Sequence, residues 1–415
     1  MFMKNNDSNR LERRKYWIIF SFISLLSFVI FIGSLFTGGE NSFHFNALFI
    51  QCNDLFGDLT NNIGYASHLN PYYEEYVWGA WERIYPPMVY LICYGISRVV
   101  NIDIYIENGS FVDMLGDNKL LFVIAVLFIP IVIASMEVYK YAKNGSSIER
   151  DLTAISLILS YPFIFALERG NFIIICALLN TFFLLFHNHK NKFIREIALI
   201  MLALSSSIKF PPAFLGIILI FEKKWREALR TVLYGIMGFI IPMLFLHGGL
   251  ANIEKLFQNI ISNISIYSPF SGTTFTSVVY AISGGTLTEQ AVPYIKLISY
   301  LVSAVMLISI PFLRRNWLKI GILCLVLTIV PSHSATYCLT YLFPLIIAFL
   351  NEKEYTKTEI VPFIAICLLI VVDPLIILCR IGVFVLVVYC FVCSVCSITT
   401  TLSQRTRIQL PRIEK

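Results

Sequence analysis

Two aspartates follow the first long apolar run of this 415-residue chain. Asp54 and Asp58 lie in the stretch "NDLFGDLTNNIGY", so a helix over 52–67 would place both carboxylates on one face, one turn apart. One carboxylate beside a hydroxyl group could act as a general base. The second could hold another hydroxyl group or a divalent cation. The same spacing also fits a solvated acidic helix face, and the spacing alone leaves both interpretations open.

Two isolated cations lie in short turns farther along the chain. Arg169 belongs to "ALERGNF" and Lys209 belongs to "SSSIKFPPAF". A cation at such a junction in a membrane protein is costly unless it is hydrated or paired, and a phosphate at the membrane surface could pair with both. The alternative is local: Arg169 would pair with the neighbouring Glu168, and Lys209 would extend its ammonium group to the membrane surface.

A histidine lies in a third turn, "VPSHSATY", where Ser332 and Ser334 flank His333 and Tyr337 follows. An imidazole exchanges protons near neutral pH and could assist a proton transfer. The alternative is a hydrogen-bonded structural histidine, so His333 is a secondary candidate.

The composition places all these residues in a membrane protein. Hydrophobic residues make up 57% of the chain and charged residues 14%, and the mean hydropathy is +0.74, which excludes a set of soluble domains. The net charge of +6 comes from short basic clusters between apolar runs. Such clusters mark cytoplasmic loops, so the charge indicates topology and no nucleic-acid partner. No convincing cleavage site follows the first apolar run, which we therefore expect to be a retained helix.

Apolar runs predict about twelve membrane-spanning helices, each needing about 20 residues. They are expected at 16–36, 119–139, 151–167, 171–187, 194–208, 210–221, 229–246, 291–312, 317–331, 336–350, 359–377 and 380–398. Basic clusters in every second loop place both termini in the cytoplasm. A further apolar stretch at 85–100 would invert every later helix if it spanned, so we expect a partial or re-entrant helix there. Thirteen spans with an outer C-terminus is the alternative.

The predicted fold is therefore a single all-α integral membrane domain over 1–415. It carries an acidic, aromatic outer loop region at 37–118 and a second outer loop at 247–290. The second loop holds an amphipathic stretch, 253–266, followed by the Ser/Thr/Gly-rich sequence "YSPFSGTTFTSVVY".

Cysteines and cofactor motifs give little support for a bound group. Cys390, Cys393 and Cys396 repeat at helical spacing in an apolar run that offers no other type of metal ligand. We therefore interpret them as packing residues and predict no metal site there. No nucleotide-binding motif occurs, so no cofactor is assigned beyond the divalent cation that the aspartates could hold.

Several segments together resemble the GT-C glycosyltransferases, and most of all the bacterial branch similar to polyprenyl-phosphate-mannose-dependent mannosyltransferases. The likeness extends over roughly 45–350. Its elements are the aspartate-bearing first outer loop, "NPYYEEYVWGAWERIYPPMVY", "YPFIFALERGNFIIICALLN", "SSSIKFPPAFLGIILIFEKKWREAL" and "VPSHSATYCLTYLFP". Each element is short, and their order and spacing carry the resemblance. The turn here reads Gly170-Asn171 where the family often has Gly-Gln.

The resemblance implies a role for each candidate. The first outer loop would supply the carboxylate base, with Asp58 as first choice and Asp54 as second. Arg169 and Lys209 would hold the donor phosphate. The remaining candidates for substrate binding are Glu168, Asn171, His333 and Tyr85.

The implied activity is transfer of a hexose from a polyprenyl phosphate to a glycan or glycolipid of the cell envelope, such as lipopolysaccharide O-antigen. The active site would face the periplasm from the cell inner membrane. A transporter or flippase of lipid-linked glycans is the alternative from another class, but it should show charges near span centres and internal symmetry. A polysaccharide polymerase should carry its largest loop late, whereas here the largest outer loop comes first.

Overall fold

The structure is a computed structural model that describes residues 2–37, 56–73, 83–100, 102, 117–141, 146–264, 268–332, 334–371 and 376–409. The described part contains α-helices and short 3-10 helices and no strand. This confirms the predicted all-α polytopic membrane class.

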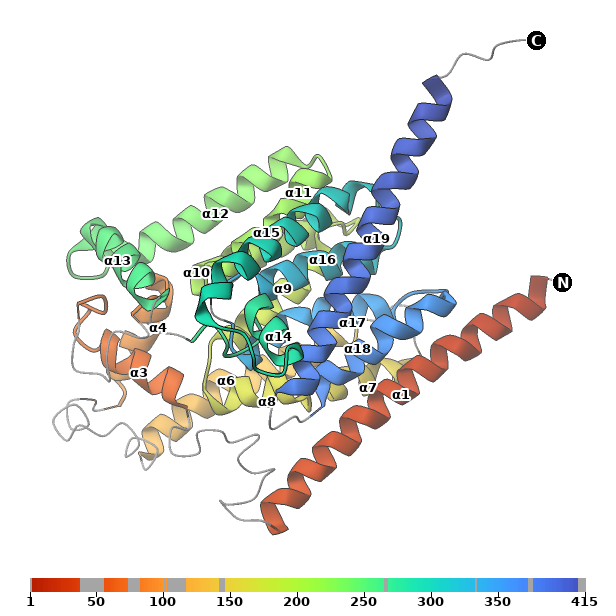
Figure 1. Cartoon of the computed structure of the whole chain (residues 1–415). Helices are drawn as coiled ribbons and strands as arrows, with labels where there is room; N and C mark the ends of the chain where they lie inside the picture. Colours follow the sequence, from red (N-terminus) through yellow and green to blue (C-terminus); the bar gives the residue numbers. More distant parts are fainter. Residues whose placement is uncertain are drawn as a thin grey trace, which may run out of the picture.

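The helices follow one another in a long series (Figure 1). In the first half they are α1 (Phe2–Thr37), α3 (Gly57–Ala66), α4 (Pro87–Ser97), α6 (Asn118–Tyr139), α7 (Ser147–Ile158), α8 (Tyr161–Glu168), α9 (Ile173–Phe186), α10 (Lys192–Ile208), the 3-10 helix η4 (Pro211–Gly216) and α11 (Ile217–Phe221). In the second half they are α12 (Trp225–Leu244), α13 (Asn252–Ile264), α14 (Phe275–Ile282), α15 (Val292–Ser309), α16 (Asn316–Ile329), the 3-10 helix η8 (Thr336–Leu342), α17 (Phe343–Leu350), α18 (Ile360–Ile370) and α19 (Ile377–Gln409).

Four helical stretches in the described part are long and apolar enough to cross a membrane. They are α6, α12, the stretch Glu289–Phe312 around α15, and Ile377–Gln404 of α19. The pair α7 and α8, bent by 47°, can count as a fifth, and five shorter apolar helices accompany them. All coincide with apolar runs of the sequence, whereas the total of twelve spans stays a prediction.

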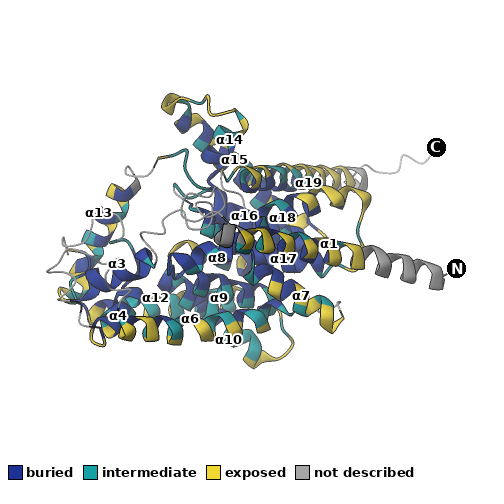
Figure 2. Cartoon of the chain, turned by 90° about the horizontal axis from the view of Figure 1, so that it is seen from below, coloured by how far each residue is buried: buried dark blue, intermediate teal, exposed yellow. Residues whose placement is uncertain are grey.

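The helices turn apolar side chains both inward and outward. On α6 the outward side chains Phe122, Val126, Ile129 and Ile133 repeat every three or four residues and are exposed. A continuous apolar stripe of this kind needs lipid as its solvent. In α16, by contrast, all residues from Ile320 to Ile329 are buried, and Figure 2 shows such buried segments inside the bundle.

The two described ends of the chain lie on one side of the molecule, and α3, α4 and α13 lie on the opposite side (Figures 1 and 2). This arrangement agrees with termini that share one membrane face. With 11 residues, α4 is only about 16 Å long, against a hydrocarbon core of roughly 30 Å. It is thus too short to span by itself, in agreement with a partial helix at 85–100.

The turn between α8 and α9 anchors the start of α3. Gly170 adopts a left-handed conformation with φ of 60°, and the N–H groups of Gly170 and Asn171 donate to the carbonyls of Leu167 and Ala166, which forms a Schellman motif. The N–H of Phe56 donates to the carbonyl of Glu168 (2.7 Å), and the N–H of Asp58 donates to that of Arg169 (3.1 Å). The first turn of α3 therefore sits directly on this motif.

A methyl group at Gly170 should separate α3 from the turn. A Cβ there would lie 2.9 Å from Leu59 Cβ and 2.9 Å from Phe56 Cδ1, at a backbone conformation that L-residues rarely adopt. We expect Gly170→Ala to lower the free energy of unfolding by about 2 kcal/mol or more. Gly235→Ala in α12, where a Cβ would meet nothing within 4 Å, is the matched control and should be neutral or stabilising. SDS-titrated unfolding in mixed micelles measures both, and equal stability of the two variants would contradict the docking argument.

Candidate active site

Asp58 is the second residue of α3 and its side chain is buried, with 6% of the residue exposed. The interpretation of a solvated acidic face is therefore wrong for Asp58, because the turn after α8 covers this end of the helix. The helix expected over 52–67 begins at Gly57 in the described residues. Asp54 and His333 lie outside the described residues.

Three hydrogen bonds fix the carboxylate of Asp58. Arg169 donates to Oδ1 from Nη2 at 2.6 Å and from Nε at 3.1 Å, and Asn171 Nδ2 donates to Oδ2. The carbonyl oxygen of the Asn171 side chain accepts from the N–H of Ile173 at 2.9 Å. Because that bond requires the oxygen on this side, the amide nitrogen must face Asp58. The sequence places Arg169 and Asn171 in one turn, and the fold brings the turn to Asp58.

The ion pair leaves part of the carboxylate available. Arg169 binds only Oδ1, and Oδ2 has accepted a single hydrogen bond from Asn171, so Oδ2 can accept another from a ligand hydroxyl group. Arg169 is itself buried and does not line the cavity beside Asp58. Its guanidinium group binds Asp58, and the phosphate contact suggested by the sequence stays a prediction.

Lys209 lies across the cavity, immediately after α10, where the backbone becomes extended. Its ammonium nitrogen is 4.9 Å from the ring centre of Tyr85 and 5.5 Å from that of Tyr337. Cation–π contacts of this length stabilise a cation without neutralising it. Among the described residues no carboxylate pairs with Lys209, so its positive charge remains available to an anionic ligand.

Tyr85 connects the two charged groups. Asn171 Nδ2, which binds Asp58, lies 3.4 Å from the Tyr85 hydroxyl oxygen, while the Tyr85 ring faces Lys209. The hydroxyl of Tyr72 donates to the carbonyl of Tyr85 at 3.1 Å, and burial raises the pKa of Tyr72, so this hydroxyl stays a neutral donor. Tyr85 is therefore held at its backbone as well as at its hydroxyl group.

Asp58, Tyr85 and Lys209 line one cavity of about 320 Å³, near the lower end of the range for small-molecule sites. Asp58 and Lys209 are the charged residues among the described residues that line it. The other lining residues are mostly apolar or aromatic, with a few hydroxyl and amide groups: Ile84, Pro86, Ile173, Phe210, Pro211, Ile260, Asn263, Leu327, Pro331, Ser332, Ser334, Ala335, Tyr337, Cys338 and Tyr341. Phe210 and Pro211 are exposed, which places an opening beside Lys209.

Three of the residues proposed from the sequence meet in this cavity, and Asn171 lies one hydrogen bond behind them. Glu168 is buried at the end of α8, outside the cavity lining, and its backbone carbonyl binds Phe56. A substrate contact of Glu168 stays a prediction. Sequence reasoning missed Tyr337 as a partner of Lys209, because a cation–π contact between residues so far apart has no local signal.

No group of three or more His, Cys, Asp or Glu side chains in the described part could hold a metal ion. The divalent cation considered for the two aspartates stays a prediction, since Asp54 is not described.

Comparison with known proteins identifies the family. The family model of glycosyltransferase family 87 matches residues 108–335, which is more than half of the chain. The chain belongs to glycosyltransferase family 87. This is a GT-C-type family, so the expected superfamily is confirmed, whereas the mannosyltransferase-like branch stays a prediction. No curated protein and no solved structure gave a match.

The family assignment makes the chain a membrane glycosyltransferase and removes the reason to consider a transporter. The matched region contains Arg169, Asn171 and Lys209, whereas Asp58 and Tyr85 precede it. The family match therefore does not include Asp58, and only the geometry of the cavity places this residue in the site. The position of Asp58 in the glycosyltransferase rests on its contacts with the matched turn.

Removing Arg169 should destabilise the protein by leaving a buried carboxylate without its counter-charge. We expect Arg169→Met to lower the free energy of unfolding by about 3 kcal/mol or more, as for other broken buried ion pairs. Arg226→Met, at an exposed position of α12, is the control and should change little. Unfolding in mixed micelles compares the two. A loss at Arg169 no larger than at Arg226 would show that the ion pair is not formed.

Proposed function

We propose that this family 87 glycosyltransferase transfers a hexose from a polyprenyl-phosphate donor to a glycan or glycolipid acceptor of the cell envelope, such as lipopolysaccharide O-antigen. The observation that carries the proposal is that two side chains of opposite charge line one cavity. Lys209 offers a cation without a carboxylate partner among the described residues, and Asp58 offers a fixed carboxylate.

The charge of the site matches a phosphodiester. Among the described residues, Arg169 offsets the charge of Asp58, and Lys209 is the other charged residue that lines the cavity. A polyprenyl-phosphate sugar carries one negative charge, whereas a diphosphate carries more. The single charge of a monophosphate-linked donor would therefore balance the ammonium charge of Lys209. This matters because the site is largely apolar, and an unpaired charge there is costly.

The surroundings of the cavity opening also suit the lipid part of the donor. The opening beside Lys209 is flanked by the exposed apolar residues Phe210 and Pro211, and the outward faces of the neighbouring helices are apolar. A polyprenyl chain could thus stay in the bilayer while its phosphate reaches Lys209. The basic loops of the sequence and the shared side of the two ends support a periplasmic site.

In the proposed reaction Asp58 takes the proton of an acceptor hydroxyl through Oδ2, and the acceptor oxygen forms a bond to the anomeric carbon of the hexose. The bond from that carbon to the phosphate oxygen breaks, and its electron pair leaves with polyprenyl phosphate. Negative charge therefore develops on the phosphate beside Lys209, where the ammonium group stabilises it. Arg169 and Asn171 hold Asp58 in position, which replaces the phosphate contact first considered for Arg169.

Substitutions of the two charged groups should have different kinetic effects. We expect Asp58→Asn to lower kcat for transfer by about 100-fold or more, because it removes the base. Lys209→Gln should raise the donor KM as well as lower kcat, and Lys209→Arg should recover part of the activity. Lys255→Gln, a cation over Tyr73 outside the cavity lining, is the matched control and should be active.

The assay uses purified protein in lipid nanodiscs with radiolabelled polyprenyl-phosphate mannose, glucose or galactose and envelope glycans as acceptors. Undiminished transfer by Asp58→Asn would exclude the base assignment. Absence of transfer from every lipid-linked hexose would exclude the donor class.

Donor binding can be followed without transfer. Cys338 lines the cavity and is partly exposed, so bound donor should slow its alkylation by N-ethylmaleimide. We expect protection by polyprenyl-phosphate hexose in the wild type and in Asp58→Asn, and weaker protection in Lys209→Gln. Mass spectrometry of the Cys338 peptide measures the rate, with the exposed Cys396 as internal reference. Equal protection in the Lys209 variant would argue against phosphate binding by Lys209.

A further inference from the structure

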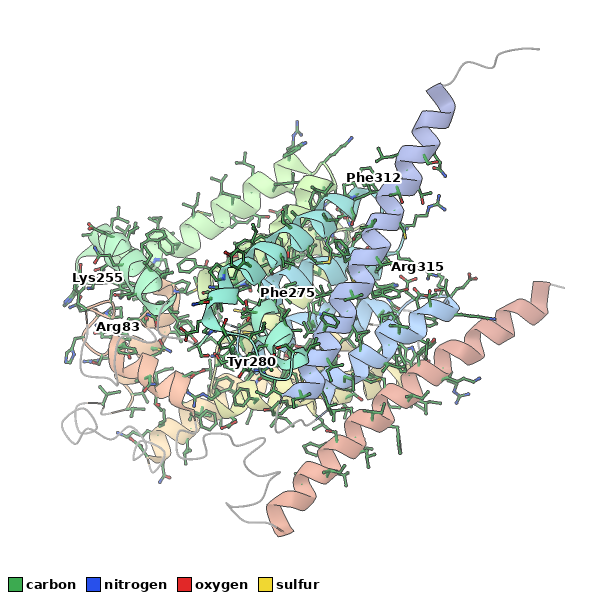
Figure 3. The ribbon with its side chains drawn as sticks, in the orientation of Figure 1. Arg83, Lys255, Phe275, Tyr280, Phe312 and Arg315 are labelled. Atoms are coloured by element: carbon green, nitrogen blue, oxygen red, sulfur yellow. The ribbon has the colours of Figure 1, made fainter. Side chains whose placement is uncertain are left out.

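The Ser/Thr/Gly-rich stretch of the second outer loop forms a closely bonded turn, which we name the serine-threonine turn and define as residues 268–277. Its hydroxyl-bearing residues Thr273, Thr274 and Ser277 are buried. Thr274 Oγ1 accepts from the N–H of Ser277 at 3.2 Å and so caps α14, whose first three residues complete the serine-threonine turn (Figure 3 labels Phe275, the first residue of α14). The turn is thus folded into the protein and is not a loose connection.

The serine-threonine turn is bonded to the wall of the cavity. The N–H of Thr273 donates to the carbonyl of Ser334 at 2.7 Å, and Thr273 Oγ1 lies 3.2 Å from both the carbonyl oxygen and Oγ of Ser334. Gly272 has φ of 75°, and a Cβ there would lie 2.1 Å from the Ser334 carbonyl oxygen. Ser334 and the following Ala335 line the cavity, so the position of this wall depends on the turn.

Arg380, in the first turn of α19, holds the other side of the serine-threonine turn. Its Nε donates to the carbonyl of Gly272 at 2.9 Å, and its Nη2 donates to that of Phe270 at 3.1 Å. The Gly272 carbonyl also accepts from Ser277 Oγ at 3.0 Å. A guanidinium group can bind two carbonyls at fixed spacing, which a lysine ammonium group cannot do with the same geometry. A cation in a membrane-spanning helix is costly unless bonded in this way.

We propose that Arg380 is a positioning residue of the glycosyltransferase, which fixes the Ser334–Ala335 wall of the cavity through the serine-threonine turn. The chain of contacts runs from Arg380 to Gly272 and Phe270, and from Thr273 to Ser334. Arg380 lies in α19, beyond the matched residues 108–335, so a helix outside the family match contributes to the site. The kinetic consequence rests on the proposed function, whereas the structural consequence does not.

The structural test measures the wall directly. The N–H of Cys338 donates to the carbonyl of Ala335 at 2.8 Å, so alkylation of Cys338 reports the position of the wall. We expect Arg380→Leu to speed the alkylation of Cys338 by N-ethylmaleimide about tenfold relative to Cys396. Arg315→Leu is a demanding control, because it removes a donor to a backbone carbonyl, that of Glu354 at 2.6 Å, together with ion pairs to Glu352 and Glu359, and Arg315 lies well away from Phe275 in Figure 3. An unchanged Cys338 rate in Arg380→Leu, or an equal increase in Arg315→Leu, would overturn the proposal.

The kinetic test separates positioning from general stability. We expect Arg380→Leu to lower kcat/KM for hexose transfer by roughly 10- to 100-fold, because small displacements in a reacting site have effects of this size. Arg380→Lys should recover part of the loss, and Arg315→Leu should retain wild-type kcat/KM. Gly272→Ala should resemble Arg380→Leu, and the double variant should lose less than the product of the single losses, because both act on one contact chain. Full activity of Arg380→Leu, or a loss equal to the unfolded fraction, would overturn the proposal.

The two tests also distinguish this proposal from the proposed function. If the wild type transfers no hexose from any lipid-linked donor, the donor class is wrong, but the alkylation rates still decide the role of Arg380. If the wild type transfers hexose and the Cys338 rate is unchanged in Arg380→Leu, the function stands and the positioning role falls.

Discussion

The buried ion pair between Asp58 and Arg169 is the interaction on which the site depends. Burial of two charges is expensive, and only close geometry with further hydrogen bonds offsets it. The structure supplies both, because Arg169 contacts Oδ1 twice and Asn171 contacts Oδ2. The pair also joins α3, from the outer loop region, to the turn between α8 and α9, which belongs to the helical bundle. Together with the backbone hydrogen bonds from Phe56 and Asp58 to this turn, it fixes the position of α3 beside the cavity.

The same ion pair determines which cation of the cavity can bind an anionic ligand. Since Arg169 is bound to Asp58, Lys209 is, in the part of the chain that the structure describes, the cavity residue whose charge is left for a ligand, and it contacts aromatic rings there instead of a carboxylate. These positions come from interruptions of the helices. Lys209 follows α10 and precedes η4 at Pro211, and Tyr337 lies in η8. Irregular backbone at membrane depth is tolerated where it lines a cavity, and here it supplies the functional side chains.

The sequence was sufficient for the fold class and for much of the residue list, for a physical reason. Long apolar runs and tight turns are local signals, so the positions of the apolar helices and the turn at Arg169 could be predicted, whereas the total of twelve spans stays a prediction. Lys209 is indicated because a cation at the end of an apolar segment is costly unless it has a use. Asp58 is indicated by its spacing from Asp54 and by the family resemblance, and Tyr85 by the resemblance alone. Their partners could not be predicted in the same way. The contact of Asp58 with Arg169 spans 111 residues, and the contact of Arg380 with Gly272 spans 108. Pairings at such separations depend on helix packing, which no local pattern encodes, so the sequence indicates Arg169 as a cation of the site without indicating its pairing with Asp58.

The proposed reaction has a consequence for the charges that explains why an arginine is placed behind the base. Before transfer, Asp58 balances Arg169, and Lys209 balances the single charge of the phosphodiester. During transfer the proton of the acceptor neutralises Asp58, and the departing phosphate gains the negative charge that Asp58 loses. The total charge of the site stays the same, but one negative charge moves from Asp58, beside Arg169, to the phosphate beside Lys209. Protonation of Asp58 removes the negative charge that Arg169 contacts at Oδ1, which raises the free energy of this buried pair. Departure of polyprenyl phosphate therefore favours return of the proton from Asp58, so the ion pair that positions the base also restores it for the next reaction.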